Sequence, residues 1–493
     1  MKMMDPRAPH AAVADGVEAF TDADAALARI AEIYDRSAGH IRAGFEALAK
    51  GGDIVPNGAY YPYLGITVTA ADLHLDARFA YGVAVDPGAY GTTLTRPSLL
   101  ADYYRDQIHL LIQNHKVPVY VGVSKRPIPL PFVIENATAD VTETQVRAMA
   151  QRFALPDLNV IDDSIANGTH TPAEGLPRPL SLFTAERVDY SIARLGHYTA
   201  TAPQHFQRFV LLTNYQRYVD EFCAYGKRLV AEGDEYDSFV EPGDVFTPNP
   251  RLTDKPASGT PLVNLPQMPA YHLTRPDKLG ITMVNIGVGP SNAKTITDHL
   301  AVLRPHCWLM LGHCAGLRRS QFLGDYVLAH GYVRDDQVLD ADLPPYVPVP
   351  PIAEVQVALQ QAVAKITGLE GADLKSRLRT GSVLTTDNRN WELRFQDIYA
   401  RLNQSRAIAV DMESATIAAN GFRFRVPYGT LLCVSDKPLH GEIKLRGMAN
   451  AMYRERIAQH LEIGIETIDI LRAEGVRKLH SRKLRSFDEP SFR

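Results

Sequence analysis

Apolar residues near the start of the chain, between Asp22 and Lys50, recur with helical spacing. The intervals of three and four place them on one side of an α-helix, and they are Ala26, Leu27, Ile30, Ile33, Tyr34, Ile41, Phe45 and Leu48. Further on, short apolar segments predict strands at 63–69, 79–85 and 117–123, and a helical pattern covers 99–113. Because these strands cluster instead of alternating strictly with helices, we expect an α+β unit.

Residues 162–179 (DDSIANGTHTPAEGLPRP) contain many turn-forming residues and prolines, and few residues that could be buried. This composition predicts a linker or an extended crossing segment. We therefore expect two domains, an N-terminal α+β domain over residues 1–175 and a second domain over residues 176–493.

After this segment the pattern changes to continuous apolar runs of four to seven residues, at 209–213, 281–287, 307–312, 325–329, 381–385, 407–410 and 429–434. Such runs favour strands that are buried on both faces of a sheet covered by helices. Helical patterns intervene at 292–303, 352–367, 413–420 and 448–474. The alternation predicts an α/β domain whose site-forming loops follow the carboxyl ends of the strands.

Composition narrows the classes of function. The 493 residues include 52 Lys plus Arg and 56 Asp plus Glu, and 45% are hydrophobic, which excludes a mainly disordered chain. The formal net charge of −4 argues against a nucleic-acid partner. Four cysteines, at 223, 307, 314 and 433, suit neither a disulfide framework nor a paired-Cys zinc site. Because the N-terminus lacks a signal-peptide pattern and no apolar run reaches about 18 residues, we expect a cytoplasmic protein without a membrane partner.

Two strand ends carry residues suited to binding an anion. Residues 285–292 (NIGVGPSN) lead from a strand into a helix through Gly287 and Gly289, which let backbone N–H groups approach a ligand. The segment matches neither the dinucleotide fingerprint nor a P-loop, so an ordinary strand-to-helix turn explains it equally well. After the run 209–212, Asn214 suits a tight turn and Arg217 suits a phosphate clamp. A surface arginine in the first turn of a helix is the alternative for Arg217.

Three further strand ends supply titratable side chains. His313 lies between small residues in Gly-His-Cys-Ala-Gly (312–316), as on the floor of a pocket, although a single histidine is more often structural. Asp411 and Glu413 follow the run 407–410 at the start of an Ala-rich helix, where one can cap the helix while the other faces a cleft. Asp436 follows the run 429–434. Two carboxylates at strand ends suit glycosidic cleavage, which needs an acid and an anion that stabilises positive charge.

Taken in chain order, these motifs resemble the nucleoside phosphorylase/nucleosidase family over about residues 200–475. The motifs are the Asn turn with Arg, G-x-G, G-x-C-x-G, G-D-x-V, D-M-E-S and V-S-D. The resemblance implies a nucleoside-phosphorylase-like α/β domain with a mixed central sheet. The N-terminal α+β domain and the segments 285–295, 411–419 and 434–441 are similar to one branch of the family, whose members hydrolyse AMP. The expected reaction is cleavage of the N-glycosidic bond of AMP to adenine and ribose 5-phosphate.

The resemblance also implies roles for individual residues. Asp436, if it holds a proton, would donate it to N7 of the purine, and anionic Glu413 would accept hydrogen bonds from the ribose hydroxyls. Met412 would pack beneath the ribose. The remaining substrate-binding residues are expected to be Ser435, Asn214, Arg217, Gly287, Gly289 and His313, of which the last four are assigned to the phosphate end. No residue is assigned to the activation of water.

The chain departs from the wider family at the phosphate-binding arginine that precedes G-x-C-x-G, because Met310 stands near that place. Arg318 and Arg319 are the candidate substitutes. A purine nucleoside or nucleotide phosphorylase and a non-catalytic nucleotide sensor are the alternatives left open. The chemistry requires no metal and no cofactor. The resemblance further implies a homohexamer and a regulatory N-terminal domain, with MgATP as an allosteric activator and phosphate as an inhibitor.

Overall fold

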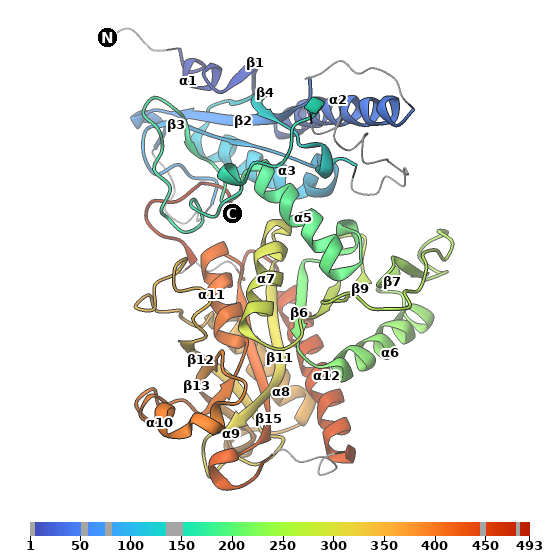
Figure 1. Cartoon of the computed structure of the whole chain (residues 1–493), viewed down its shortest axis with the longest axis vertical. Coiled ribbons are helices and arrows are strands. Elements are labelled where there is room, and N and C mark those ends of the chain that lie inside the picture. Colours follow the sequence, from blue (N-terminus) through green and yellow to red (C-terminus); the bar gives the residue numbers. More distant parts are fainter. Residues whose placement is uncertain (1–4, 51–57, 74–80, 135–150, 444–449, 480–483) are drawn as a thin grey trace. The chain divides into compact units, whose positions relative to one another are not determined.

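The computed structural model describes residues 5–50, 58–73, 81–134, 151–443, 450–479 and 484–493 (Figure 1). The chain divides into two compact units, residues 1–193 with 485–493, and residues 194–484. This differs from the expected boundary at 175/176, because the division falls inside helix α5 (Ala185–Thr199). The end of the chain belongs to the first unit, where Phe492 N–H donates to the carbonyl oxygen of Leu180 at 3.0 Å. The amino-acid composition of the C-terminal segment does not indicate that it pairs with the first unit in this way.

The N-terminal unit contains a sheet of order β1-β4-β2-β3-β5. Its pairings are antiparallel except for β3 with β5, and the strands are β1 (Ala14–Phe20), β2 (Tyr60–Val68), β3 (Gly88–Thr93), β4 (Val119–Pro127) and β5 (Arg178–Pro179). The strands expected at 63–69 and 117–123 are confirmed as β2 and β4. The strand expected at 79–85 is wrong over its described part, because Gly82 takes a left-handed φ of +67° in a bend; residues 79 and 80 lie outside the described residues.

The helices of this unit are α1 (Ala8–Ala11), α2 (Ala23–Ala49) and α3 (Pro97–His115). The carboxylate of Asp22 caps α2 by accepting a hydrogen bond from Ala25 N–H at 2.8 Å. All eight apolar positions that predicted α2 are buried. Part of this face, including Phe45 and Leu48, packs with Tyr61 of β2 in one hydrophobic cluster. The periodicity of the sequence therefore identified both the helix and the face that it buries.

The second unit contains a mixed sheet of order β14-β13-β12-β15-β11-β6-β10-β9-β7-β8. An additional pairing of β14 with β11 closes five of these strands into a ring. The strands are β6 (Phe209–Thr213), β7 (Ser238–Glu241), β8 (Val245–Pro248), β9 (Ala270–Thr274), β10 (Ile281–Asn285), β11 (Cys307–Gly316), β12 (Tyr326–Asp335), β13 (Leu378–Thr386), β14 (Ala409–Asp411) and β15 (Tyr428–Asp436). All seven strands expected from apolar runs are confirmed, although several extend further. The expected mixed sheet is confirmed as well.

Helices alternate with groups of strands along the chain of this unit (Figure 1). They are α6 (Gln216–Glu232), α7 (Pro290–Leu300), α8 (Ala353–Thr367), α9 (Gly371–Arg377), α10 (Phe395–Gln404), α11 (Ser414–Phe424) and α12 (Asn450–Glu474). The helices expected near 292–303, 352–367 and 413–420 are α7, α8 and α11. The helix expected at 448–474 is α12, and its first two positions lie outside the described residues. Because β6, β10, β11 and β15 are parallel, their carboxyl ends open on one edge of the sheet.

Candidate active site at the carboxyl ends of the strands

Three strand ends converge on the side chain of Glu413. Asn214, which follows β6, donates from Nδ2 to Glu413 Oε2 at 2.9 Å. Gly289, which follows β10, donates its backbone N–H to Glu413 Oε1 at 2.6 Å. Glu413 itself lies between β14 and α11. The carboxylate is thus held from both oxygens by groups that lie 199 and 124 residues away in the chain.

Burial and charge act together on this carboxyl group. Glu413 is only 1% exposed. Desolvation, followed by repulsion from the neighbouring Asp411, raises the pKa of Glu413 to about 8. The hydrogen bonds from Gly289 and Asn214 act in the opposite direction by stabilising the ionised form. A carboxyl group with this pKa gains or loses its charge in response to a modest change in its surroundings.

The sequence predicted that either Asp411 or Glu413 caps the following helix. In the structure, Asp411 accepts the hydrogen bonds at the start of α11. Its Oδ2 accepts hydrogen bonds from Ser414 N–H, at 2.8 Å, and from the Ser414 hydroxyl. Its Oδ1 accepts from the Thr385 hydroxyl at 2.5 Å. Burial raises the pKa of Asp411, while these donors favour its charged form. These three hydrogen bonds stabilise the charged form of Asp411, and its charge in turn raises the pKa of Glu413.

The backbone conformation of the 285–292 segment requires glycine at positions 287 and 289. Gly289 has φ +113° and ψ 155°, a conformation that is almost restricted to glycine. Gly287 has φ +67°, and a Cβ there would lie 2.9 Å from Nδ2 of Asn292. This turn aims the Gly289 N–H at Glu413. The expected contact of Gly289 with a ligand is therefore taken, in this structure, by a protein carboxylate.

Asp436 lies at the end of β15, and a β-bulge precedes it. Cys314 of β11 pairs with Val434 and Ala315 pairs with Asp436, so that Ser435 is the extra residue. Ser435 donates its hydroxyl to Asp436 Oδ1 at 2.5 Å. Bulges bend a strand and redirect its side chains, and they are frequent beside active sites. The bulge separates the half-buried Asp436 from the regular ladder of the sheet.

Lys437, which follows Asp436, has a carboxylate partner in Glu442. Its Nζ lies 2.6 Å from Oε1 of Glu442, and its side chain is only 6% exposed. The backbone N–H of Lys437 also donates to the Glu442 carbonyl oxygen at 2.7 Å. The charge of Lys437 is therefore paired with a carboxylate other than Asp436.

The other sequence-predicted residues lie around the same edge of the sheet. Met412 is half-buried between Asp411 and Glu413. His313 is buried in β11, with its ring 4.4 Å from that of Tyr215, centroid to centroid. Arg217 is exposed in the first turn of α6 and forms no ion pair with a described carboxylate. The position of Arg217 fits both a solvated surface arginine and a cation that awaits a ligand.

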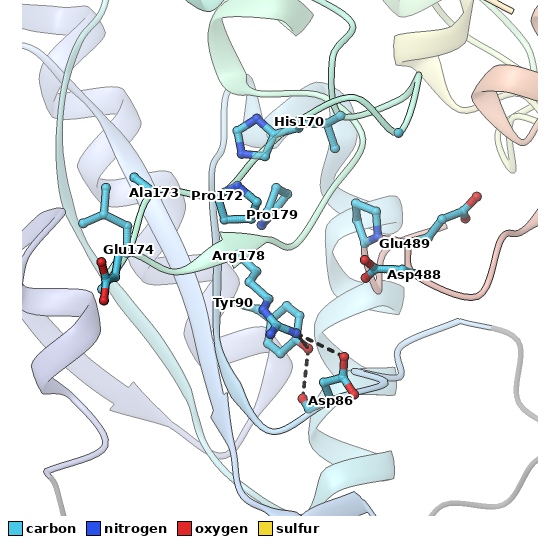
Figure 2. A pocket seen from close by; sticks show the side chains of 15 residues that line it. Asp86, Tyr90, His170, Pro172, Ala173, Glu174, Arg178, Pro179, Asp488 and Glu489 are labelled. Atoms are coloured by element: carbon cyan, nitrogen blue, oxygen red, sulfur yellow. Dashed lines mark hydrogen bonds and ion pairs between the residues drawn. The ribbon is translucent and has the colours of Figure 1, made fainter. Parts of the chain in front are cut away.

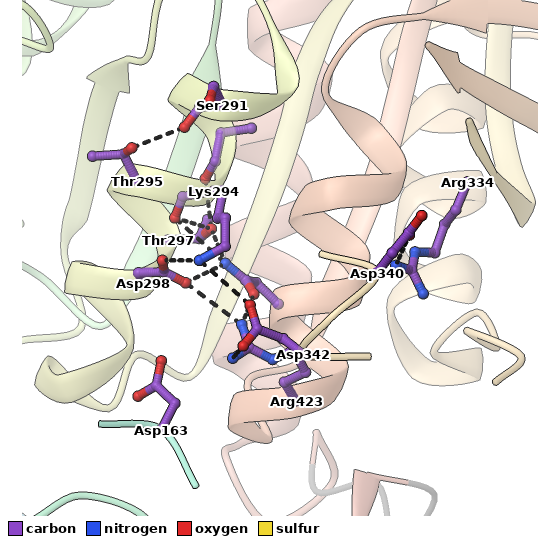
Figure 3. A network of polar contacts seen from close by, with 12 residues as sticks. Asp163, Ser291, Lys294, Thr295, Thr297, Asp298, Arg334, Asp340, Asp342 and Arg423 are labelled. Atoms are coloured by element: carbon purple, nitrogen blue, oxygen red, sulfur yellow. Dashed lines mark hydrogen bonds and ion pairs between the residues drawn. The ribbon is translucent and has the colours of Figure 1, made fainter. Parts of the chain in front are cut away.

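An ionic network fixes the two helices whose N-termini carry Gly289 and Glu413 (Figure 3). Nδ2 of Asn420 in α11 donates to Thr297 Oγ1 and to Asp298 Oδ1 of α7, both at 2.8 Å. Arg423, with a side chain 1% exposed, lies 3.6 Å from Asp298 and 3.5 Å from Asp342. Because these contacts are buried, they hold α7 and α11 in one relative position and maintain the hydrogen bond between Gly289 and Glu413.

Two participants were missed by sequence reasoning. Thr385 ends β13 and joins two elements, since its hydroxyl donates to Asp411 and accepts from Ala415 N–H at 2.9 Å. Cys314 is buried, and desolvation, followed by the nearby Cys433, Asp411 and Asp436, raises the pKa of its thiol. The available signal was their position, because each lies at or near the end of a predicted strand.

The candidate substitute for the missing phosphate arginine lies elsewhere. Met310 is fully buried in β11. Arg318 donates from Nη2 to the carbonyl oxygen of Arg406 at 2.9 Å and lines a separate pocket. None of the sequence-predicted site residues lines that pocket. The substitution of the missing arginine by Arg318 or Arg319 stays a prediction.

A larger cavity, of about 510 Å³, lies within the N-terminal unit (Figure 2). Its charged lining consists mainly of carboxylates, from Asp86, Glu174, Asp488 and Glu489. The single lining arginine, Arg178, is already 3.3 Å from Asp86 Oδ2. This lining does not offer the unpaired cations that a polyphosphate needs. Among the described residues, no group of three or more His, Cys, Asp and Glu side chains is placed to hold a metal ion, and no helix is long and apolar enough to cross a membrane.

Comparison with known families gives two matches along the chain. Residues 25–177 match a family described as "Bacterial AMP nucleoside phosphorylase N-terminus". Residues 252–462 match the "Phosphorylase superfamily". The second match contains the segments with Gly287 and Gly289, Glu413 and Asp436.

Individual proteins are similar over most of the length. An AMP nucleosidase from Escherichia coli K12 is 49% identical over 475 residues, which cover 95% of this chain and 98% of that protein. An AMP nucleosidase of Escherichia coli O157:H7 gives the same values. Among solved structures, an AMP nucleosidase from Bacteroides thetaiotaomicron is 28% identical, with a TM-score of 0.43, over 58% of this chain and 98% of that one. A purine nucleoside phosphorylase from Toxoplasma gondii is 17% identical, with a TM-score of 0.40, over 56% and 98%.

Proposed function

This chain belongs to the AMP nucleosidase family and is an N-glycosyl hydrolase, and we propose that it cleaves AMP to adenine and ribose 5-phosphate with Asp436 as the general acid and Glu413 as the anion that stabilises the sugar. The reaction class and the substrate rest on the relatives, which are similar along nearly the whole chain. The role of Glu413 rests on one observation, the convergence of Asn214 and Gly289 on its buried carboxyl group, and the role of Asp436 rests on the resemblance and on its place beside the bulge at the end of β15.

The bond that breaks joins C1′ of the ribose to N9 of adenine. Positive charge develops on the sugar as this bond lengthens, and the electron pair moves onto the purine. Asp436 would transfer a proton to N7, which turns adenine into a neutral leaving group. Water supplies the oxygen that bonds to C1′ and releases a proton, so the products are adenine and ribose 5-phosphate. General acid catalysis of this kind contributes about 10²–10⁴-fold to a rate.

Glu413 is suited to stabilise the sugar. Its oxygens would accept hydrogen bonds from the ribose hydroxyls, and its negative charge would face the developing cation. With a pKa of about 8, the carboxylate forms increasingly as the pH rises, and it attracts the positive charge of the sugar, which develops only as the glycosidic bond breaks. The stabilisation therefore increases between the ground state and the transition state, and this difference is what accelerates a reaction.

The substrate's 5′-phosphate is assigned to Arg217. Its guanidinium group lies in the strand-to-helix turn that also holds Asn214, and it has no carboxylate partner among the described residues. An arginine there can bind two phosphate oxygens at once. Met412, Ser435, Gly287 and His313 complete the proposed substrate-binding set.

Phosphorolysis is the competing reaction, because the second matched family is named for phosphorylases. The buried Met310 replaces the arginine that would bind free phosphate, and Arg318 lines a different pocket. Both observations favour water as the nucleophile. Incubation of AMP with and without phosphate, followed by identification of the sugar product, separates the reactions. We expect ribose 5-phosphate in both cases; a bisphosphorylated sugar formed only with phosphate would overturn the proposal.

Three regulatory expectations follow from the family resemblance and remain predictions: a homohexamer, activation by MgATP and inhibition by phosphate. A cytoplasmic location is also still a prediction. Sedimentation of the full chain tests the assembly, and AMP turnover with added MgATP or phosphate tests the effectors.

A further inference from the structure

A small pocket beside the amino-terminal ends of β12 and β13 lies outside the proposed catalytic machinery. Its volume is about 230 Å³. The polar residues that line it are Arg318, Ser320, Gln321, Lys375, Arg379 and Thr380, and we call it the basic pocket. None of the residues assigned to AMP or to its cleavage lines it.

The charge of this lining is one-sided. Three cationic side chains and no carboxylate face the basic pocket. The charge of Arg379 is partly compensated by Asp325, which does not line the basic pocket. Nε of Arg379 lies 3.5 Å from Oδ2 of Asp325, and the same carboxylate also pairs with Arg377. Arg318 and Lys375 are exposed and form no ion pair with a described carboxylate. The basic pocket therefore carries a net positive charge that favours an anion.

A buried amide supplies an independent sign of a ligand. Gln321 is 1% exposed, and its Oε1 accepts the backbone N–H of Arg318 at 2.8 Å. This hydrogen bond fixes which end of the amide carries the oxygen. The other end, Nε2, is buried and has no hydrogen-bond partner among the described residues. A buried donor without an acceptor is unfavourable, and buried polar groups in proteins almost always find a partner.

We propose that the basic pocket binds the phosphate group of a small anion, either inorganic phosphate or a sugar phosphate. Such a group carries nearly two negative charges at neutral pH and offers several acceptor oxygens. Arg318, Lys375 and Arg379 would neutralise the charge, and Gln321 Nε2 would donate to one oxygen. The volume is below the roughly 300–1,000 Å³ of pockets for drug-sized ligands, which favours a ligand smaller than a complete nucleotide.

Calorimetric titration of the full chain with inorganic phosphate, and separately with ribose 5-phosphate, tests this proposal. Lys375→Gln removes an exposed charge, and Gln321→Glu keeps the acceptor for Arg318 N–H but loses the donor. Lys255→Gln is the matched control, because Lys255 is an exposed lysine of the same unit that does not line the basic pocket. Arg217→Gln reports binding at the catalytic site. Thermal unfolding without ligand verifies that each variant is folded.

We expect Lys375→Gln and Gln321→Glu each to raise the dissociation constant by about tenfold or more, as loss of a charge-assisted hydrogen bond does. Lys255→Gln should leave this binding unchanged, and Arg217→Gln should weaken only the separate binding of ribose 5-phosphate at the catalytic site. An effect on inorganic phosphate identifies the free ion as a ligand, and an effect confined to ribose 5-phosphate identifies the ester. The proposal is overturned if both pocket variants bind as the parent does, if Lys255→Gln weakens binding equally, or if only Arg217→Gln changes it.

Discussion

The hydrogen bond from Asn214 to Glu413 allows a quantitative prediction. In the structure, Nδ2 of Asn214 lies 2.9 Å from Oε2 of Glu413 and lowers a pKa that burial and Asp411 have raised to about 8. A hydrogen bond to a charged group contributes about 1.5–3 kcal/mol, and about 1.4 kcal/mol equals one pKa unit. Asn214→Ala should therefore raise the pKa of Glu413 by about one unit or slightly more.

The sign of the effect on activity follows from the role of the anion. The ionised fraction of Glu413 rises with pH, so kcat/KM should increase with pH and level off above about pH 8. At pH 7, about one tenth of Glu413 is ionised in the unmodified protein, against about one hundredth in Asn214→Ala. We expect a loss of about tenfold in kcat/KM at pH 7 and less than about twofold at pH 9.5.

The assay is adenine release from AMP at low substrate concentration, measured from pH 6 to 10. Asn292→Ala is the control, because Asn292 donates to the backbone oxygen of Val288 and not to Glu413. Its profile should coincide with that of the unmodified protein. If Asn214→Ala loses activity equally at every pH, Asn214 acts on the substrate directly, and the reasoning about ionisation is refuted.

Three further predictions use the same activity assay. Asp411→Asn removes the neighbouring charge, so the pH profile should move to lower pH, opposite to Asn214→Ala, while the asparagine oxygen can still accept the hydrogen bond from Ser414 N–H; a shift to higher pH would contradict the assigned repulsion. Gly289→Ala forces alanine to φ +113°, which should cost about 1–3 kcal/mol of unfolding free energy and lower kcat, although no atom lies within 4 Å of the new Cβ; unchanged thermal unfolding and turnover would show that the turn is dispensable. Arg217→Gln should raise KM for AMP about tenfold or more and leave adenosine cleavage nearly unchanged; equal effects on both substrates would remove Arg217 from the 5′-phosphate.

The apolar pattern predicted the strands and helices that position the site, because burial on both faces leaves a clear mark on a sequence. Phe209–Thr213 is both an expected apolar run and the complete strand β6. The antiparallel strands β7, β8 and β9 were not predicted. Its strands are four or five residues long, and β8 is only half-buried, so they leave weak patterns. The boundary at Ala193 could not be predicted either, because it falls within a continuous helix.

Within the site, the sequence identified the residues but not their connections. It placed Asn214, Gly289 and Glu413 at separate strand ends, whereas their hydrogen bonds depend on the order of strands in the sheet. That order is a long-range property that no local pattern contains. The division of roles between Asp411 and Glu413 could not be predicted for the same reason. Thr385, which donates a hydrogen bond to Asp411, lies on the adjacent strand β13. The ion pair of Lys437 with Glu442 could not be predicted either, because it depends on the path of the chain after β15.

The central claim is that Asp436 protonates the purine, and Asp436→Asn tests it most directly. The side chain keeps its size and loses the acidic proton. The measurement is single-turnover adenine release from AMP, together with the dissociation constant of AMP, with Asp220→Asn on the surface of α6 as control. We predict a rate reduced about 10²–10⁴-fold with AMP affinity within about threefold of the parent. Adenine release at a nearly unchanged rate would contradict the assignment of Asp436 as the acid.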